Sequence, residues 1–405
     1  MGAASSGSQA SSTTSVIIAG AVVAVSLTVA NCRRHRKAAA QLAPAFAQYP
    51  RQYIARRGTP PAIDGDINKA VWHSVPWSEA FLEIRGEDDA PPGTGPNEAQ
   101  TTRMKMLWDD DFLYIAAIMD VAAGDDFVAK FTERNSPIFH TDSDFEVFVD
   151  PAGCCHGYKE LEMNAINTVW NLMLNRPYAD GGGEISGRVA REGEPNFWEV
   201  QKQKTAARIL SGALEDPSRP AQWCCEIALA HADTLPGAPV PGPSPKVGSC
   251  WRINFSRVEK KGAVNWVWSP QIVWTPADNR YQGQVNMHLP DAWGYVVFAD
   301  VEGKLNNNSD ASAWRDPAWP ARHTAMCVYY AVHAYRQRHG GQLPRSTEEL
   351  QSERLLQESV LADCSVVISS AGKGDEGAFE VEAKSDGWTA NVRHDRLLRV
   401  TRKGA

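Results

Sequence analysis

Residues 51 to 300 contain many short runs in which apolar and polar side chains alternate, separated by segments rich in Gly and Pro. Alternation with a period of two is typical of strands that bury one face, and sustained helical periodicity is rare in this region. TRMKMLW (102–108), the acidic turn 109–111 and FLYIAAIM (112–119) predict a β-hairpin. Further strands are expected in DFEVFVD, YKELEMNAINTVWNLML, QWCCEIAL, WRINFSRVE and NWVWSP. The pattern predicts a mainly β chain with an antiparallel, jelly-roll-like β-sandwich over 51–300.

Helical patterns occur in two places. Asp66 is expected to cap a short helix in INKAVW. After the predicted linker 301–319, apolar residues recur at three- and four-residue spacing over 320–341 and predict a longer helix. STEEL (346–350) has the capping pattern of another short helix, and CSVVISS, AFEVEAK and WTANVRH predict three short strands. We therefore expect a small α+β appendage over 320–405, a helix plus a strand meander, with packing as its default role.

The first fifty residues differ in composition from the rest. No charged side chain occurs before residue 33, and the apolar run 16–29 is followed directly by RRHRK. We predict a disordered leader (1–15), an apolar helix that serves as an anchor or targeting segment (16–32), and a linker (33–50). A single-pass anchor would place the body on the cytoplasmic or organellar side of a membrane. A cleaved organellar targeting segment is the alternative.

Composition and charge narrow the class of partner. The net charge is −7, and no basic stripe interleaved with aromatic residues occurs in the body of the chain, which argues against nucleic acid. The eight cysteines include two adjacent pairs, 154–155 and 224–225. Neighbouring residues on a strand point to opposite faces, so neither pair has zinc-ligand spacing. Fourteen tryptophans provide aromatic surface for a core or for a binding site.

Acidic residues gather on one face of a predicted strand pair. In DSDFEVFVDP (142–151), alternation places Phe145, Val147 and Val149 on the core side and the four acids on the other. PAGCCHG (151–157) closes a hairpin onto the next strand, and pairing apolar with apolar residues fixes its register. Glu146 then lies opposite Glu162, and Asp144 lies opposite Asn164. Since like charges directly opposite each other destabilise a sheet, a compensating cation is expected.

WRINFSRVE (251–259) offers that cation. Arg252 and Asn254 share a polar face of this strand, and an arginine can bridge carboxylates through paired hydrogen bonds. A floor of acids, amides and arginine with aromatic walls can hold a sugar, because the polar groups bind its hydroxyls and the rings cover its C–H faces.

The motifs as a group resemble the family 9 carbohydrate-binding modules and their DOMON-like relatives. The matching segments are PPAIDGDINKAVW (60–72), LWDDDFLYIAA (107–117), DSDFEVFVDP, YKELEMNAINTVW, WRINFSRVE, WSPQ (268–271) and MHLPDAWGYVVF (287–298). The resemblance implies a saccharide-binding β-sandwich, in some members with structural calcium. The two tryptophans that clamp a terminal sugar in that family align with His140 and Met287 here, and the family's polar position on the following strand aligns with Glu162.

We therefore predict a non-catalytic saccharide-binding protein, accessory to glycan degradation, with no cofactor beyond a structural Ca²⁺ ion at Asp142 and Asp144. Its candidate saccharide-binding residues are His140, Glu146, Glu160, Glu162, Asn164, Trp170, Arg252, Asn254, Trp266, Trp268 and His288.

Three alternatives remain open. Alternate carboxyls on one strand are about 6.6 to 7 Å apart, which is compatible with an inverting glycoside hydrolase. The sandwich or the appendage could instead dock a protein partner of unknown identity. A DOMON-like pocket could hold haem through His140, Met287 or His288.

Overall fold

The computed structural model describes residues 46–404 except 260–261, 362–363 and 371–377. The predicted leader and the apolar segment 16–32 lie outside the described residues, as does the side chain of His140. None of the helices in the described part is both long enough and apolar enough to span a bilayer. The anchor and targeting roles of residues 16–32 therefore stay predictions.

Strands are the main regular elements of the chain between residues 50 and 300, as the alternation predicts. They are β1 (Gln52–Arg57), β2 (Leu82–Glu83), β3 (Thr102–Trp108), β4 (Phe112–Val121), β5 (Asp144–Asp150), β6 (Tyr158–Asn164), β7 (Val169–Leu174), β8 (Glu184–Ile185), β9 (Lys204–Ser211), β10 (Ala221–Ala230), β11 (Cys250–Glu259), β12 (Val264–Val267), β13 (Ile272–Thr275), β14 (Arg280–Gly283) and β15 (Gly294–Ala299). Short helices between them are α2 (Ala70–His73), α3 (His231–Thr234), η2 (Glu98–Gln100), η3 (Ile138–His140), η4 (Tyr178–Asp180) and η5 (Pro290–Ala292).

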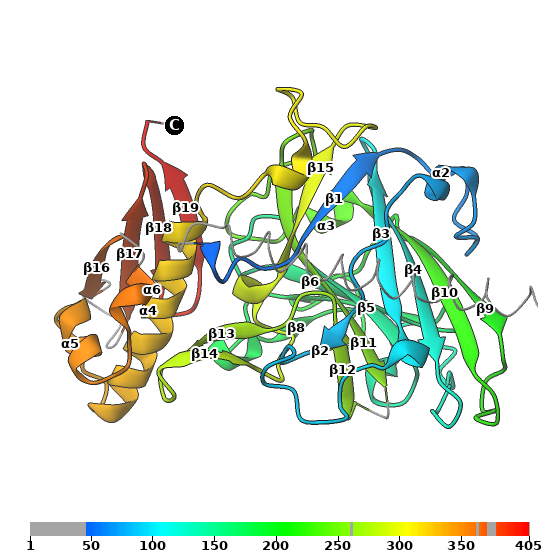
Figure 1. Ribbon diagram of the computed structural model, residues 1–405, viewed down its shortest axis with the longest axis horizontal. Helices are drawn as coiled ribbons and strands as arrows, with labels where there is room; N and C mark the ends of the chain where they lie inside the picture. Colours follow the sequence, from blue (N-terminus) through cyan, green and yellow to red (C-terminus); the bar gives the residue numbers. More distant parts are fainter. Residues whose placement is uncertain (1–45, 260–261, 362–363, 371–377, 405) are drawn as a thin grey trace, which may run out of the picture. The chain divides into compact units, whose positions relative to one another are not determined.

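In the described residues these strands form one large curled sheet and a separate ribbon, β13–β14 (Figure 1). The order in the large sheet is β8-β7-β6-β5-β11-β15-β1-β3-β4-β10-β9, with β12 beside β11 and β2 beside β12. The mainly β class is confirmed, but the sheet is mixed where an antiparallel sandwich was predicted. β1 pairs in parallel with both β15 and β3, so it joins the two halves into one sheet. Its partners lie far from it along the chain, and long connections permit parallel pairing.

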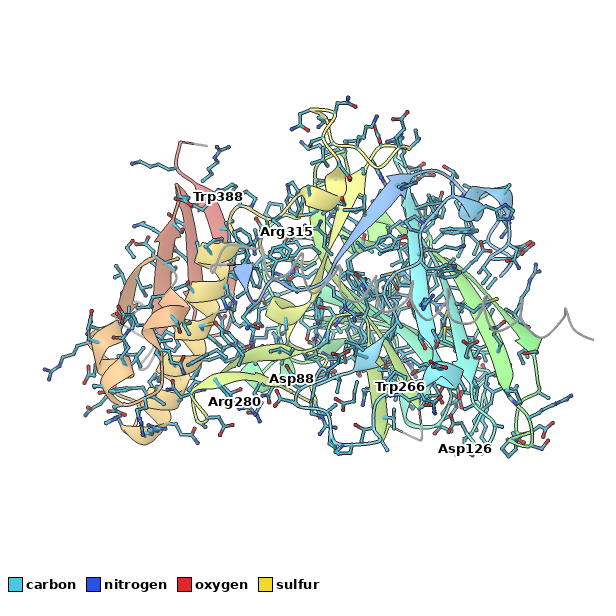
Figure 2. All side chains as sticks on the ribbon, viewed as in Figure 1. Asp88, Asp126, Trp266, Arg280, Arg315 and Trp388 are labelled. Atoms are coloured by element: carbon cyan, nitrogen blue, oxygen red, sulfur yellow. The ribbon has the colours of Figure 1, made fainter. Side chains whose placement is uncertain are left out.

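The curled sheet encloses the main apolar core. One face of most of these strands points inward, and the resulting cluster holds Met104 of β3, Phe145 and Val147 of β5, Trp223 of β10 and Phe298 of β15. The predicted core positions on β5 are thus confirmed, with Val149 also fully buried. Side chains fill the interior densely, and Trp266 lies near β12 and β2 (Figure 2).

Three predicted local features can be compared with the structure. The hairpin of β3 and β4 is confirmed. The helix expected after Asp66 is shorter than predicted: α2 begins at Ala70, and Asp66 instead accepts a hydrogen bond from the Asn68 amide and closes a turn. The strand expected over 158–174 is divided into β6 and β7 by a reversal at residues 165–168, where Asn167 has φ 68°.

The C-terminal part contains α4 (Trp319–Arg338), α5 (Thr347–Ser352) and α6 (Glu358–Leu361), after the short η6 (Ala311–Ala313). Four antiparallel strands follow in sequence order: β16 (Ser365–Ser370), β17 (Phe379–Ser385), β18 (Trp388–Arg393) and β19 (Leu398–Arg402). α4 packs on this sheet against β17 and β18 (Figure 1), and Ala325 and Val332 of the helix belong to the same buried apolar cluster as Phe379 and Val381 of β17. The helices and three strands expected here are confirmed, and β19 is an addition. The predicted domain boundaries stay predictions.

Candidate functional site

A cavity of about 670 Å³ lies on the face of β5 to β8 that points away from the main core. The same alternation that sends Phe145 and Val147 inward sends Glu146 of β5 and Glu160 and Glu162 of β6 into this cavity. Loops that are distant in sequence complete it. Lining residues outside β5 and β6 include Phe139, Trp170, Tyr178, Glu184, Arg188, Met287 and His288.

The hairpin of β5 and β6 sets the acids in a row. Glu146 pairs with Glu162, and Asp144 pairs with Asn164, as predicted. The turn between the two strands packs closely against the backbone of residues 237 and 238. At Gly157 a Cβ atom would lie 2.5 Å from the Gly237 carbonyl oxygen and from the Ala238 Cα, so no other residue fits there without displacing backbone.

The acids are buried. Glu146, Glu160 and Glu162 are at most 6% exposed, and Asp144 beside them is fully buried. Desolvation raises the pKa of Glu146 to about 7. It also raises the pKa values of Asp144, Glu160 and Glu162 well above their usual range, and repulsion from neighbouring carboxylates adds to the shift. A protonated carboxyl can donate as well as accept a hydrogen bond, so these groups suit a ligand with hydroxyls.

Aromatic rings stand beside the acid row. The reversal at 165–168 places Trp170 directly across from Glu162 on the neighbouring strand. Phe139 of η3 stacks on Trp170, with ring centroids 5.6 Å apart at 28°. The guanidinium of Arg188 lies 5.0 Å from the Trp170 ring and is ion-paired with Glu184. The cavity therefore combines carboxyls, a cation and apolar ring surface.

His288 borders the cavity from the loop that precedes η5. Tyr158 and His288 Nδ1 share a hydrogen bond of 3.0 Å, and the Tyr178 ring meets the imidazole edge to face with centroids 4.7 Å apart. Desolvation lowers the pKa of His288 to about 4, so its imidazole is neutral at neutral pH.

The structure places several predicted site residues outside the cavity lining. Asn164 holds the 165–168 reversal, because its Oδ1 accepts from the amides of Ile166 and Thr168. Asp142 accepts from the amides of Lys130 and Phe131 and from the Asn164 side chain. The hydrogen bonds of both side chains therefore stabilise the loops beside the strands.

Arg252 does not bridge Glu146 and Glu162, contrary to the role expected for it. It lies opposite Asp150 and donates to the carbonyl oxygens of Trp293 and Asp291. Asn254 also binds backbone, since its Nδ2 donates to the Ser269 carbonyl oxygen at 2.8 Å. Across from Glu146 stands Ser256, which carries no charge.

Trp266 and Trp268 belong to the main core, and neither is among the residues that line the cavity. The residues brought together are Glu146, Glu160, Glu162, Trp170 and His288.

Sequence reasoning missed Phe139, Tyr178, Glu184 and Arg188. The alternation that reveals strand faces is absent from the segments that carry them. Only Phe139 had a usable signal, because it directly precedes the position that the family resemblance selected, His140.

His288 should make stability depend on pH. The unfolded chain protonates histidine near its ordinary pKa of 6.5, whereas the folded protein protonates His288 near 4. Its stabilising contribution is therefore complete above pH 6.5 and is lost as the pH falls toward 4, by about 3 kcal/mol in total. The free energy of unfolding of His288→Gln, measured in urea across this range, should decline less than that of the wild type. The exposed His73→Gln is the matched control; equal decline in all three proteins would contradict the assignment.

No protein-family model matches the chain, and no curated protein matches it. Solved structures with some similarity include a protein of Bacteroides uniformis ATCC 8492, provisionally assigned as carbohydrate-binding, with 13% identity and a TM-score of 0.40 over 62% of this chain and 99% of that chain. A family 9 carbohydrate-binding module from Caldicellulosiruptor kristjanssonii in complex with cellotriose has 14% identity and a TM-score of 0.36 over 66% and 100% of the two chains. A module of the same family and organism in complex with glucose has 15% identity and a TM-score of 0.35 over 63% and 100%. At these values, membership of the family that the motifs resemble stays a prediction.

Proposed function

We propose that the cavity on β5 to β8 binds a saccharide and that the protein is a carbohydrate-binding protein without hydrolytic activity. The observation that carries the proposal is a row of buried carboxyls beside a tryptophan ring, with polar atoms left unpartnered. Glu162 Oε2 and Trp170 Nε1 are buried and have no hydrogen-bond partner among the described residues. Since buried polar groups normally have partners, a bound molecule with hydroxyls would satisfy both the acceptor and the donor.

The dimensions and chemistry of the cavity support a small polar ligand with apolar faces. Its volume of about 670 Å³ is in the usual range for ligand pockets. Sugars present hydroxyls at their edges and C–H groups on their ring faces. The acid row provides hydrogen-bonding groups for the first, and the stacked rings of Phe139 and Trp170 provide apolar surface for the second.

The electrostatics favour binding over hydrolysis. Two-carboxylate glycosidases need one protonated acid beside one ionised carboxylate, which requires environments that separate the two pKa values. Here the pKa values of Asp144, Glu146, Glu160 and Glu162 all move upward. None of the four carboxyls has its pKa held below the ordinary value, so the row lacks a carboxylate stabilised in its ionised form beside a protonated acid.

Replacing the aromatic wall should weaken saccharide binding. Trp170→Leu removes the ring and its donor and should lower affinity at least about tenfold, equivalent to about 1.4 kcal/mol. Phe139→Leu, at a half-buried position, should lower affinity by a smaller factor with little effect on the fold. The measurement is a saccharide array with the full-length protein, followed by calorimetry of the retained sugar with each variant.

Trp388→Leu is the matched control, because Trp388 lies on β18 and does not line the cavity. It should leave saccharide affinity unchanged. The proposal is overturned if the wild type retains no saccharide, or if both cavity variants bind the retained sugar as tightly as the wild type does.

A further inference from the structure

Three carboxyls at the floor of the cavity lie close enough together to share one ion. Asp144, Glu146 and Glu162 each offer an oxygen, and these oxygens lie within 4.8 Å of one another. Oxygens on opposite sides of a Ca²⁺ ion are separated by about 4.8 Å, because each Ca–O distance is about 2.4 Å. Small side-chain adjustments would therefore let all three bind the same Ca²⁺ ion.

No ion pair joins a cation to this trio among the described residues. The largest charge effects on Asp144 and Glu162 come from other carboxylates, including Glu146 and Glu160, and the nearby Arg188 interacts with Glu162 without forming an ion pair with it. The arginines on adjoining segments have partners elsewhere: Arg188 pairs with Glu184, and Arg257 pairs with Glu259 at 2.8 Å. Carboxylates in the interior must be neutralised by protons or by a cation, because an unpaired buried charge costs several kcal/mol.

Unpartnered oxygens provide independent support for a ligand at this place. Asp144 is fully buried, and its Oδ1 accepts from the Val258 amide at 3.0 Å, while its Oδ2 has no partner among the described residues. Glu162 is 2% exposed, and its Oε2 has no partner there either. Ser256, opposite Glu146 in the sheet, adds a fully buried hydroxyl beside the trio.

We propose that Asp144, Glu146 and Glu162 bind one divalent cation of the Ca²⁺ type at the floor of the cavity. The donors are all oxygens, which favours Ca²⁺ or Mg²⁺ over Zn²⁺. Ca²⁺ accepts longer bonds and irregular geometry, whereas Mg²⁺ requires near-octahedral coordination at about 2.1 Å. Asp142 is not a ligand of this site, because its oxygens already accept the amides of Lys130 and Phe131.

The cation would also take part in ligand binding, a step that rests on the proposed function. Glu146 and Glu162 belong to the trio and also line the cavity. Ca²⁺ takes about six to eight oxygens, so three carboxylates leave positions open. Hydroxyl oxygens of a saccharide are suitable donors for those positions.

Cation binding is tested first, on the full-length protein without sugar. Calorimetry should show one Ca²⁺ per chain, and Tb³⁺ bound in its place should luminesce on excitation of tryptophan, since Trp170 neighbours Glu162. Saturating Ca²⁺ should raise the melting temperature by at least about 2 °C relative to EDTA. Asp144→Asn and Glu162→Gln should each reduce Ca²⁺ affinity at least about tenfold and make the Ca²⁺-dependent rise in melting temperature smaller than that of the wild type at the same Ca²⁺ concentration.

Asp150→Asn is the matched control, because it removes a buried acid on the same face of β5 that belongs neither to the trio nor to the cavity lining. It should keep Ca²⁺ affinity within about threefold of the wild type. In EDTA, Asp144→Asn should melt at or above the wild-type temperature, since the substitution relieves carboxylate repulsion, and this separates loss of the site from loss of the fold. Absence of Ca²⁺ binding by the wild type, or unchanged affinity in both trio variants, overturns the site.

The second measurement is saccharide affinity with and without Ca²⁺. A sugar bound at least about tenfold more tightly with Ca²⁺ supports the shared role. A sugar bound equally well in EDTA overturns that role and leaves the cation site in place. If no saccharide binds under either condition while Ca²⁺ binds, the proposed function fails and the cation site stands.

Discussion

Replacing Glu226 by alanine is expected to lower the free energy of unfolding by about 3 to 5 kcal/mol, among the largest effects of any single substitution in the described chain. The Glu226 carboxylate is fully buried on β10 and accepts from four donors of the segment that precedes β2. They are the amides of Asp64 and Gly65, the Lys69 ammonium and the Trp72 indole. Removal of the carboxylate leaves the two amides and the indole without this acceptor, and the Lys69 ammonium keeps only its ion pair with Asp64 and its hydrogen bond to the Asp66 carbonyl oxygen.

Urea unfolding measures the loss, and hydrogen exchange locates it. The Gly65 amide should exchange faster in Glu226→Ala than in the wild type, while amides at the centre of the β5–β6 hairpin should keep their relative protection. Glu226→Gln should cost less than alanine, since it keeps the volume and one acceptor. Glu192→Ala, at an exposed loop position, is the control and should change stability by no more than about 0.5 kcal/mol. A loss below about 1 kcal/mol in Glu226→Ala would contradict the role assigned to the carboxylate.

Glu226 also illustrates what sequence can reveal. A single acid within the otherwise apolar run QWCCEIAL is a visible anomaly in a strand that is buried on both faces. The sequence does not identify its partners, because they come from residues about 160 positions earlier. The same limit explains the helix expected after Asp66: the binding of the Asp64 and Gly65 amides by Glu226 favours a turn there, and α2 starts only at Ala70.

The acid row was predictable because it depends on local rules. Strand alternation and the pairing of apolar faces placed Glu146 opposite Glu162, and the structure has that pairing. The surroundings of the row depend on distant segments. η3, η4 and the loop that carries His288 cover the acids, so a face that alternation alone would leave to solvent is buried. Burial, and with it the direction of each pKa shift, is a tertiary property.

Two further predictions, the single strand over 158–174 and the position of Arg252, were wrong for different reasons. The strand expected over 158–174 reverses at 165–168, because the Asn164 side chain accepts two amides of that turn and Asn167 tolerates a positive φ. Asn164 and Asn167 were the residues in the sequence that could have indicated this turn.

Arg252 was assigned to the acids by strand alternation, yet its position along β11 aligns it with Asp150. Facing the correct side of a sheet does not fix which neighbours a long side chain reaches.

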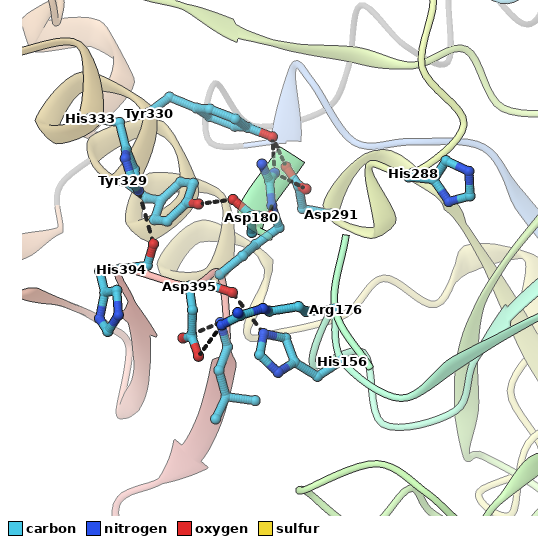
Figure 3. Close-up of polar contacts among 12 residues, drawn as sticks. His156, Arg176, Asp180, His288, Asp291, Tyr329, Tyr330, His333, His394 and Asp395 are labelled. Atoms are coloured by element: carbon cyan, nitrogen blue, oxygen red, sulfur yellow. Dashed lines mark hydrogen bonds and ion pairs between the residues drawn. The ribbon is translucent and has the colours of Figure 1, made fainter. Parts of the chain in front are cut away.

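The C-terminal part contacts the cavity loops through a buried polar cluster. The Tyr329 hydroxyl donates to Asp180 at 2.6 Å, and the Tyr330 hydroxyl donates to Asp291 at 2.9 Å (Figure 3). Arg396, in the turn between β18 and β19, forms ion pairs with both carboxylates, at 2.6 Å to Asp180 and 3.0 Å to Asp291. Its side chain is 4% exposed, and its backbone φ is 69°, a conformation that non-glycine residues adopt only under constraint.

Replacing Arg396 by methionine should therefore lower the free energy of unfolding by about 3 to 5 kcal/mol, because two buried carboxylates lose their shared cation. Urea unfolding of the full-length protein measures the effect. In the background Asp180→Asn and Asp291→Asn, the same replacement should cost much less, since no unpaired charge remains. Arg399→Met, at an exposed position of β19, is the matched control. An equal loss in both backgrounds would show that Arg396 acts through packing alone.

Arg396→Met should also lower the affinity of the cavity for a saccharide. Asp180 ends η4, which begins with the cavity residue Tyr178, and Asp291 belongs to η5, which follows the loop of His288. Arg396 thus holds two segments that contribute rings to one wall of the cavity, and Tyr178 and His288 meet there. Loss of the ion pairs should loosen that wall and lower saccharide affinity by about threefold or more, although Arg396 itself does not line the cavity. Calorimetry with the retained sugar measures this affinity at a temperature where the variant is folded. If Arg396→Met binds the sugar as tightly as Arg399→Met does, the polar cluster contributes to stability and not to saccharide binding.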